Sequence, residues 1–372
     1  MTPVFSHLLH ALDVSKTQCA RVKRHWMLCV FLLLFSPFLF AGDKEKAVDY
    51  YHRGELKKAF VYMEKAARQG DAEAQGALGQ LFSRGEGCGQ DSGKAAFWFK
   101  KAAEQGDITA QYNLGLQYMN GTGVEIDYGQ ARYWYLKAAA QGSESALFNM
   151  GGLYYHGYGV TKNDAEAVRW YLKAAEAGKT SAMTQLGQMY RNGEGVTKNL
   201  PQALKWTTKA AEQNEPKAQY NLAMMYYGGE GVEQNYATAK AWFEKAAEQK
   251  LDEAQYMLGV IYNRGLGVKQ DKHEAVKWFA LAAAQGHDKA AYNIATVYYN
   301  GKGISKNEAE AFRWMKRAAE MGLPEGEFVL GIFYEDGVGV KKDQAQAVMW
   351  YQKAAMQGNA EAKKRLDAPN LK

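Results

Sequence analysis

Few residues in this chain have the types and the spacing that chemistry would need. The glycine-rich stretch GEGCGQDSGKA, at 85–95, superficially resembles a phosphate-binding loop. That loop requires a glycine where Cys88 stands and a serine or threonine where Ala95 stands, and it follows a β-strand. No serine is followed three residues later by a lysine, the spacing of the nucleophile in penicillin-recognising enzymes. We therefore predict neither a nucleotide site nor an acyl-transfer centre.

The histidines are equally isolated. Beyond residue 41 they are His52, His156, His273 and His287, and they lack the spacing of metal ligands. Cys88 is the only cysteine in the same part, so no internal disulfide can form there, and the thiol either is buried or pairs with another chain. We predict no catalytic residue, no metal site and no cofactor, and we expect that the protein is not an enzyme.

What recurs instead is a set of polar side chains suited to binding. Two amide-rich columns, whose members are spaced by multiples of 36 residues, are predicted to line a groove that holds a partner. The predicted groove residues are Asn113, Asn120, Asn149, His156, Gln185, Asn192, Asn221, Arg264, Asn293 and Asn300. Because amides both donate and accept hydrogen bonds, a ladder of them can pair with the backbone of an extended peptide. The alternative is that they bond the backbone of neighbouring repeats.

An aromatic column runs beside the amides. It consists of Tyr112, Phe148, Tyr220, Tyr256, Tyr292 and Phe328. These rings supply either contact area for the partner or packing within the core.

The elements that position these residues form a repeat of 36 residues. Eight of the nine tryptophans keep this step, at Trp98, Trp134, Trp170, Trp206, Trp242, Trp278, Trp314 and Trp350. A second column admits only glycine or alanine, at Gly79, Gly115, Gly151, Gly187, Ala223, Gly259, Ala295 and Gly331. Since glycine in a helix costs ~1 kcal/mol relative to alanine, this column predicts close approach by the backbone of an adjacent helix. A fixed period of this length is the signature of a solenoid.

Each repeat is predicted to fold as two helices. In the unit at 107–142, apolar residues recur with helical spacing before and after a loop that contains Gly121 and Gly123. The second helix follows a position that is always Asp or Asn, which we interpret as its N-cap. These positions are Asp91, Asp127, Asn163, Asn199, Asn235, Asp271, Asn307 and Asp343. Gly142 ends this helix, and Ser143 begins the first helix of the next repeat.

Two further columns have structural interpretations. Cys88 stands where the other repeats hold valine or isoleucine, so we interpret it as a small apolar residue in a packed slot. Cations recur near the end of the second helices, where they complement the helix dipole; the alternative is an anionic surface or polymer as partner. This column contains Lys65, Lys101, Lys137, Lys173, Lys209, Lys245, Arg317 and Lys353.

Residues 1–41 do not follow the repeat. A basic cluster, an apolar run from Trp26 to Phe40 and small residues at Ala41 and Gly42 are typical of a cleaved signal peptide. The whole chain carries 46 Lys and Arg against 40 Asp and Glu, and the leader holds half of the excess. Because the net positive charge is small and no block of basic residues is present, we predict no nucleic-acid-binding surface. We expect a periplasmic or secreted protein with no stable membrane insertion after cleavage.

The unit AQYNLGLQYMNGTGVEIDYGQARYWYLKAAAQG resembles the Sel1-like repeat, a relative of the tetratricopeptide repeat. The resemblance implies an all-α fold, a right-handed α/α superhelical solenoid of helix-turn-helix repeats. We expect a signal peptide at 1–41, a shortened first repeat at 43–70, eight repeats at 71–358 and a capping helix with a tail at 359–372.

The resemblance also implies a function, that of an adaptor that binds other proteins. We expect an exported scaffold with a protein or peptide ligand, which could be a host or an envelope protein. One alternative is a cell-wall or β-lactam hydrolase like the cysteine-rich relatives, although this chain lacks their paired cysteines. A second alternative is a regulator of envelope or surface-polysaccharide assembly.

Overall fold

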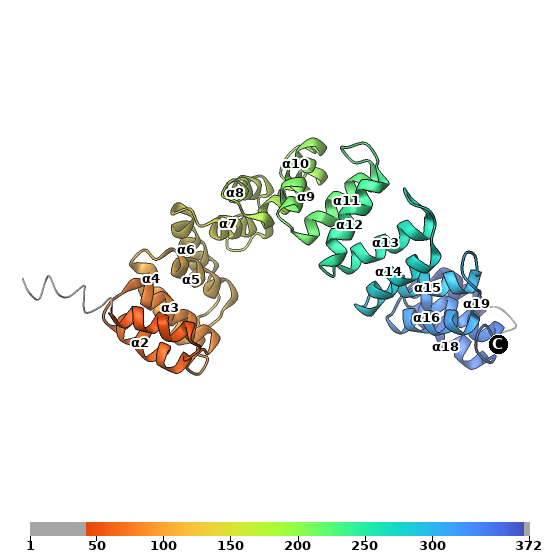
Figure 1. Cartoon of the computed structure of the whole chain (residues 1–372), viewed down its shortest axis with the longest axis horizontal. Coiled ribbons are helices and arrows are strands. Elements are labelled where there is room, and N and C mark those ends of the chain that lie inside the picture. Colours follow the sequence, from red (N-terminus) through yellow and green to blue (C-terminus); the bar gives the residue numbers. More distant parts are fainter. Residues whose placement is uncertain (1–41, 368–372) are drawn as a thin grey trace, which may run out of the picture. The chain divides into compact units, whose positions relative to one another are not determined.

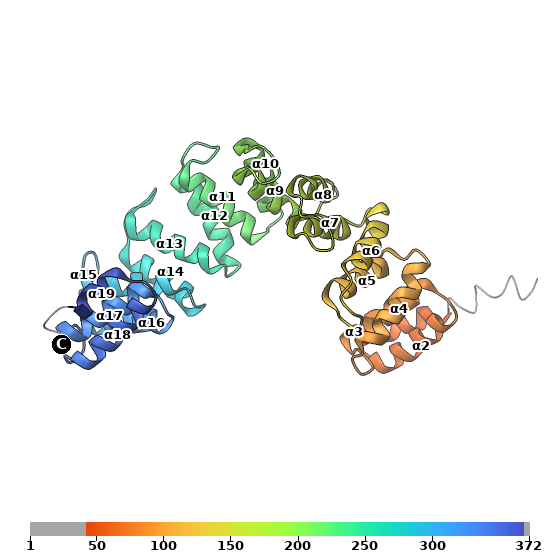
Figure 2. The ribbon, with the colours of Figure 1, turned by 180° about the vertical axis from the view of Figure 1, so that it is seen from behind.

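The computed structural model describes residues 42–367, and the predicted signal peptide lies outside them. All regular elements among the described residues are helices, which confirms the predicted all-α class. The chain divides into two compact units, residues 42–162 and residues 163–367, called unit 1 and unit 2 below. Within each unit every helix packs against the one before it and the one after it, as a helical-repeat solenoid requires (Figures 1 and 2).

Two sets of helices alternate along the chain. The first helix of each repeat, called an A helix, is 13 residues long, as is the second, the B helix. The A helices are α3 (Ala72–Arg84), α5 (Ile108–Asn120), α7 (Glu144–His156), α9 (Thr180–Asn192), α11 (Pro216–Gly228), α13 (Asp252–Arg264), α15 (Asp288–Asn300) and α17 (Pro324–Asp336). The B helices are α2 (Leu56–Arg68), α4 (Ser92–Glu104), α6 (Tyr128–Ala140), α8 (Asp164–Glu176), α10 (Leu200–Glu212), α12 (Tyr236–Glu248), α14 (Lys272–Ala284), α16 (Glu308–Glu320) and α18 (Gln344–Met356). Residues 42–52 are also helical, and α19 (Ala360–Asp367) ends the described chain.

The predicted capping residues explain where the helices begin and end. Every Asp or Asn of the predicted N-cap column is the N-cap of a B helix, and its side chain accepts a hydrogen bond from a backbone N–H three residues later. Ser143 caps α7 in the same way. The loop after α5 starts with Gly121 in the left-handed conformation, at φ 68°. Both kinds of cap satisfy backbone groups that a helix end leaves unpaired.

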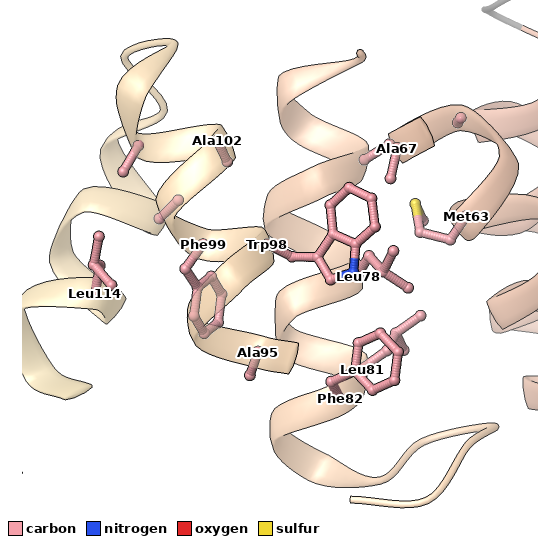
Figure 3. Close-up of a cluster of buried hydrophobic side chains, with 14 of the residues drawn as sticks. Met63, Ala67, Leu78, Leu81, Phe82, Ala95, Trp98, Phe99, Ala102 and Leu114 are labelled. Carbon is pink, nitrogen blue, oxygen red and sulfur yellow. The ribbon is translucent and has the colours of Figure 1, made fainter. Parts of the chain in front are cut away.

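Pairs of consecutive large residues on the B helices form part of the core. Trp98 is 9% exposed and Phe99 3% exposed. In Figure 3, Trp98 lies toward Met63 of the preceding repeat, while Phe99 lies on the other side, toward Leu114 of the following one. The B helix α4 therefore contributes apolar surface to more than its own repeat, as expected for repeats that bury their core by stacking.

The glycine column has a different cause from the one predicted. A Cβ placed on Gly115 would lie 2.6 Å from ring atoms of Tyr135, on the B helix of the same repeat, and Gly79 stands in the same relation to Phe99. The atoms nearest to the glycine are thus those of the ring that follows the tryptophan position. The backbone of the B helix is farther away, since the Ala131 carbonyl oxygen lies 3.3 Å from a Cβ placed on Gly115. Alanine at 223 is accommodated opposite the buried ring of Phe243.

None of the helices in the described part of the chain is long and apolar enough to cross a membrane. At the end of the described chain, α19 buries Ala362 and exposes Lys363, Lys364 and Arg365. A polar outer face of this kind is typical of a helix that caps a solenoid.

Candidate functional site

The predicted groove residues lie on the A helices, and their two columns differ in exposure. The column that contains Asn113, Asn149, Gln185, Asn221 and Asn293 is half-buried. The column that contains Asn120, His156, Asn192, Arg264 and Asn300 is exposed. We call the surface that carries both columns the A face and describe it separately in each unit.

In unit 1 the A face is hollowed between α3 and α5, which lie beside each other in both ribbon views (Figures 1 and 2). The hollow has a volume of about 400 Å³. Its polar lining consists of Gln80, Ser83, Thr109, Asn113, Asn120 and Thr122. Phe99, Tyr112 and Leu116 add apolar surface, and Arg84 adds a positive charge. The structure thus brings two predicted residues, Asn113 and Asn120, together with a cation that the prediction did not include.

Gln117 also lines this hollow, and it is buried, with 6% of its surface exposed. Its Nε2 donates a long hydrogen bond, 3.5 Å, to the carbonyl oxygen of Ser92. Its Oε1 has no hydrogen-bond partner. A buried amide oxygen without a partner is rare in folded proteins.

Two other predicted residues of unit 1 contact aromatic side chains. Asn149 approaches the hydroxyl of Tyr135, although the two groups do not meet in hydrogen-bond geometry. Burial raises the pKa of that hydroxyl, and Asn149 opposes the rise. The His156 ring stacks on Tyr158, with ring centroids 5.3 Å apart. Asn149 therefore has a structural contact, while His156 remains exposed at the end of α7.

In unit 2 the predicted residues are spread over several A helices. Asn293 Nδ2 donates to the Tyr256 hydroxyl at 3.4 Å, which links α15 to α13. Asn192 Nδ2 donates to Glu194 Oε1 at 2.7 Å. Asn293 thus bonds a neighbouring repeat, through a side-chain hydroxyl and not through its backbone. Gln185 and Asn221 are half-buried, and Arg264 and Asn300 are exposed.

The aromatic column packs against the core. Tyr112, Tyr220, Tyr256 and Phe328 each contact the ring that follows the tryptophan position of their own repeat, with ring centroids 5.6–6.0 Å apart. Packing is thus the main role of these rings, and Tyr112 also lines the hollow of unit 1.

The cation column lies over the tryptophans. Lys245 Nζ is 3.9 Å from the centroid of the Trp242 ring and Lys353 Nζ is 4.1 Å from that of Trp350. The same contact recurs at Lys101, Lys137, Lys173, Lys209 and Arg317. Cation–π attraction therefore adds to the predicted dipole effect, and it supports the structural interpretation of the column.

A ladder of glutamines was not predicted. Gln105 Nε2 donates to Gln75 Oε1 at 2.8 Å and to the carbonyl oxygen of Gly70 at 3.2 Å. Gln75 Nε2 in turn donates to the carbonyl oxygen of Ala67, in the preceding repeat, at 3.1 Å. The same pairing recurs between Gln141 and Gln111, Gln249 and Gln219, Gln285 and Gln255, and Gln357 and Glu327. The constant separation of 30 residues is the signal that could have revealed it.

Cys88 is half-buried against the core of unit 1, with Sγ 3.7 Å from the carbonyl oxygen of Leu81. Burial raises the pKa of its thiol, which favours the protonated form. Within residues 42–367 no three His, Cys, Asp or Glu side chains are grouped so as to hold a metal ion.

Comparisons with known proteins bear on the repeats. A family model described as Sel1 repeat matches residues 55–71, 72–107, 108–143, 144–179, 180–215, 216–251, 252–287, 288–323 and 324–359. A protective antigen present in uropathogenic Escherichia coli strains, whose structure displays an SLR fold, is 34% identical over 88% of this chain and 79% of that chain, with a TM-score of 0.72. A Sel1 repeat protein from Oxalobacter formigenes is 33% identical over 82% of this chain and 89% of that chain, with a TM-score of 0.68. None of the curated proteins compared matches the chain.

Proposed function

The chain belongs to the Sel1 repeat family, and from this premise we propose that it is an exported scaffold whose A face holds an extended segment of another protein. Membership of this family implies a protein–protein interaction scaffold. The use of the A face, and export to the periplasm or the exterior of the cell, are the parts that we add.

The observation that carries the proposal is the hollow between α3 and α5. Its lining combines amides and hydroxyls, which both donate and accept hydrogen bonds, with Phe99, Tyr112 and Leu116. A peptide backbone presents alternating donors and acceptors, so it finds partners on such a surface whatever its side chains are. Half-buried amides are also partly desolvated already, so a ligand displaces less water from them than from fully exposed groups.

Export is supported from two directions. The apolar run from Trp26 to Phe40 follows a basic cluster and precedes small residues, as in a secretory signal peptide. The relative from uropathogenic Escherichia coli is described as a protective antigen, a description that fits an exported protein. An exported scaffold in a periplasmic or secreted location fits both observations.

The test is a selection of peptides from a random dodecapeptide library on the immobilised full-length chain. We expect peptides that compete with one another and whose affinity falls about thirtyfold in Asn113→Ala/Asn120→Ala, because each of the two lost hydrogen bonds is worth ~1 kcal/mol. Gln130→Ala, an exposed amide on the B helix α6, is the matched control and should bind as the unchanged chain does.

Thermal unfolding of the same variants completes this test. A similar Tm for all three proteins would show that the loss of affinity comes from the contact. The proposal fails if no peptide is selected, or if the double variant binds the selected peptides with full affinity.

A further inference from the structure

The outward side of the B helices in unit 1 carries three large apolar side chains at one position of the repeat. They are Val61 on α2, Phe97 on α4 and Tyr133 on α6, and they are 48%, 54% and 47% exposed. Unit 2 fills the same position with Arg169, Lys205, Ala241, Lys277, Arg313 and Met349. The fold therefore does not require a large apolar residue there. Exposed apolar residues that occur singly are ordinary, whereas a contiguous set marks an interaction surface.

The three side chains lie on neighbouring helices. Figure 3 shows that Trp98 of α4 lies toward Met63 of α2, and Trp134 of α6 belongs to the same core cluster. Residues 36 positions apart have the same place on successive B helices. The apolar side chains therefore form a row along the outward side of α2, α4 and α6. We call this row, with the cations around it, the B face of unit 1.

The same three helices are strongly basic. They contain nine Lys or Arg residues and two Glu residues. The six B helices of unit 2 contain twelve Lys or Arg residues and ten Asp or Glu residues, so their charges nearly cancel. The cations of unit 1 are Lys57, Lys58, Lys65, Arg68, Lys94, Lys100, Lys101, Arg132 and Lys137. The B face thus combines exposed apolar side chains with a positive field.

More than half of these cations are available to an anion. Lys58, Arg68, Lys94 and Lys100 form ion pairs with carboxylates of their own helix or its N-cap. Within residues 42–367, Lys57, Lys65, Lys101, Arg132 and Lys137 form none. The ammonium groups of Lys101 and Lys137 lie over the rings of Phe97 and Tyr133, 5.1 and 4.9 Å from their centroids. This contact uses no hydrogen-bond acceptor, so the N–H donors remain available.

We propose that the B face of unit 1 docks on a membrane surface that contains anionic lipids. Val61, Phe97 and Tyr133 enter the boundary between headgroups and acyl chains, where aromatic side chains are favoured. The lysines and arginines contact the lipid phosphates, and their long aliphatic stems let the charge stay at the surface while the apolar side chains enter. Such docking is peripheral and needs no helix that crosses the membrane. The A face lies on the other set of helices, so it stays open to its own partner.

The main alternative occupant is a soluble anionic polysaccharide, which would use the same cations. Sugars bind aromatic side chains by stacking on the ring face. One face of the Phe97 ring and one face of the Tyr133 ring are already covered by a lysine, and Val61 has no ring. The row therefore fits an apolar environment better than it fits a sugar chain.

The test is sedimentation of the chain with vesicles of phosphatidylcholine, with or without an equal part of phosphatidylglycerol. Residues 42–372 are used, because every described helix lies in this part and the apolar run from Trp26 to Phe40 would itself associate with lipid. At about 0.1 M salt we expect binding to the anionic vesicles that is at least about tenfold tighter than binding to the neutral ones. Binding should be lost at about 1 M salt, because the charges are then screened.

Two double variants test the two components of the B face. Phe97→Ala/Tyr133→Ala should weaken binding about thirtyfold, because the apolar area that enters the lipid is lost. Ala241 already provides alanine at this position, so the variant should keep the fold. Lys57→Gln/Arg132→Gln should also weaken binding about thirtyfold, since each basic residue near an anionic surface contributes to affinity. A Tm close to that of the unchanged chain checks the fold of both variants.

Unit 2 provides matched controls. Leu281→Ala removes a side chain that is 50% exposed on α14, and Lys217→Gln/Lys289→Gln makes the same change in net charge on two A helices. Both control variants should bind the anionic vesicles as the unchanged chain does. Equal weakening by test and control variants would show a general effect of charge or hydrophobicity, and it would contradict the assignment to the B face.

Other results would also overturn the inference. It fails if neutral and anionic vesicles bind the chain equally well, or if both double variants bind with full affinity. It fails as well if the chain binds polygalacturonate but no vesicle, because the occupant would then be a soluble polymer. Selection of peptides by the A face is a separate measurement, so none of these results would remove the proposed function.

Discussion

The ring of Tyr135 lies so close to the backbone of Gly115 that a Cβ there would meet two ring atoms at 2.6 Å. Tyr135 is 1% exposed, so the ring has no free space into which it can move. Gly115→Ala is therefore expected to lower the free energy of unfolding by ~1–3 kcal/mol, as overpacking does in other cores. Urea titration followed by circular dichroism measures the change.

The matched control for this variant is Gly93→Ala on α4. Gly93 is also helical, but the nearest atom to an added Cβ is 3.5 Å away, which is an ordinary contact. Here helix propensity alone predicts no loss, or a gain of up to about 1 kcal/mol. Equal destabilisation by the two variants would contradict the role that we assign to the Tyr135 ring.

The sequence predicts much of the fold because each marker of the repeat has one physical meaning. An Asp or Asn before an apolar periodic stretch caps a helix, and Asp91 and Asp127 both do so. The glycine column was located correctly but explained incorrectly, since the sequence does not say whether a backbone or a ring lies above Gly115. The pairing of Gln105 with Gln75 leaves a signal in the sequence, the constant separation of 30 residues, but whether the two side chains meet depends on their rotamers.

Substitutions of the two paired glutamines, Gln75 and Gln105, should be strongly coupled in their effects on the free energy of unfolding. Gln105→Ala removes the donor and leaves the buried Oε1 of Gln75 unpaired, so we expect a loss of ~1–3 kcal/mol in the free energy of unfolding. Gln75→Leu combined with Gln105→Ala removes both partners and should cost less than Gln105→Ala alone. Ala291 and Met321 take these two places in another repeat, where no amide pair is needed. Simple additivity in this double-mutant cycle would show that the pair is not coupled.

Leu281 interrupts the cation column, three residues after Trp278, and it is 50% exposed. Leu281→Lys should place an ammonium over that ring, as Lys245 does over Trp242, and raise the free energy of unfolding by ~0.5 kcal/mol. Lys245→Ala should produce a loss of similar size. The prediction fails if Leu281→Lys lowers the Tm.

The Arg191–Glu230 pair predicts a pH dependence. The side-chain hydrogen bond from Arg191 lowers the pKa of Glu230 below its usual value. A carboxylate with a lowered folded-state pKa stabilises the fold above its unfolded pKa of about 4.3, and this contribution is lost as the pH falls through the folded-state pKa. The Tm of Glu230→Gln should therefore lie below that of the unchanged chain at about pH 7, and the gap should close near pH 3.

Solvent limits the size of this effect. Both side chains are more than a third exposed, so screening should keep the contribution near or below about 1 kcal/mol. Glu233→Gln, an exposed carboxylate in the same loop, controls for the change in net charge. A gap that stays constant from neutral to acidic pH would contradict the assignment to the ion pair.

The site was less predictable than the fold. Amide columns at a fixed step indicated the A face, but they did not say which amides are needed for packing, and Asn293 proves to bond Tyr256. The hollow depends on the local approach of α3 and α5, which no single repeat reveals. Gln117 was detectable, because it is polar in a column of buried apolar residues.

The most direct test of the account is to locate a library-selected peptide on the chain. A peptide that carries a benzophenone side chain is photo-cross-linked to the full-length protein, and the modified residues are identified by mass spectrometry. The account predicts adducts on the A helices of unit 1, in α3 and α5 at residues 72–84 and 108–120. Adducts confined to the B helices α4 and α6 would contradict it.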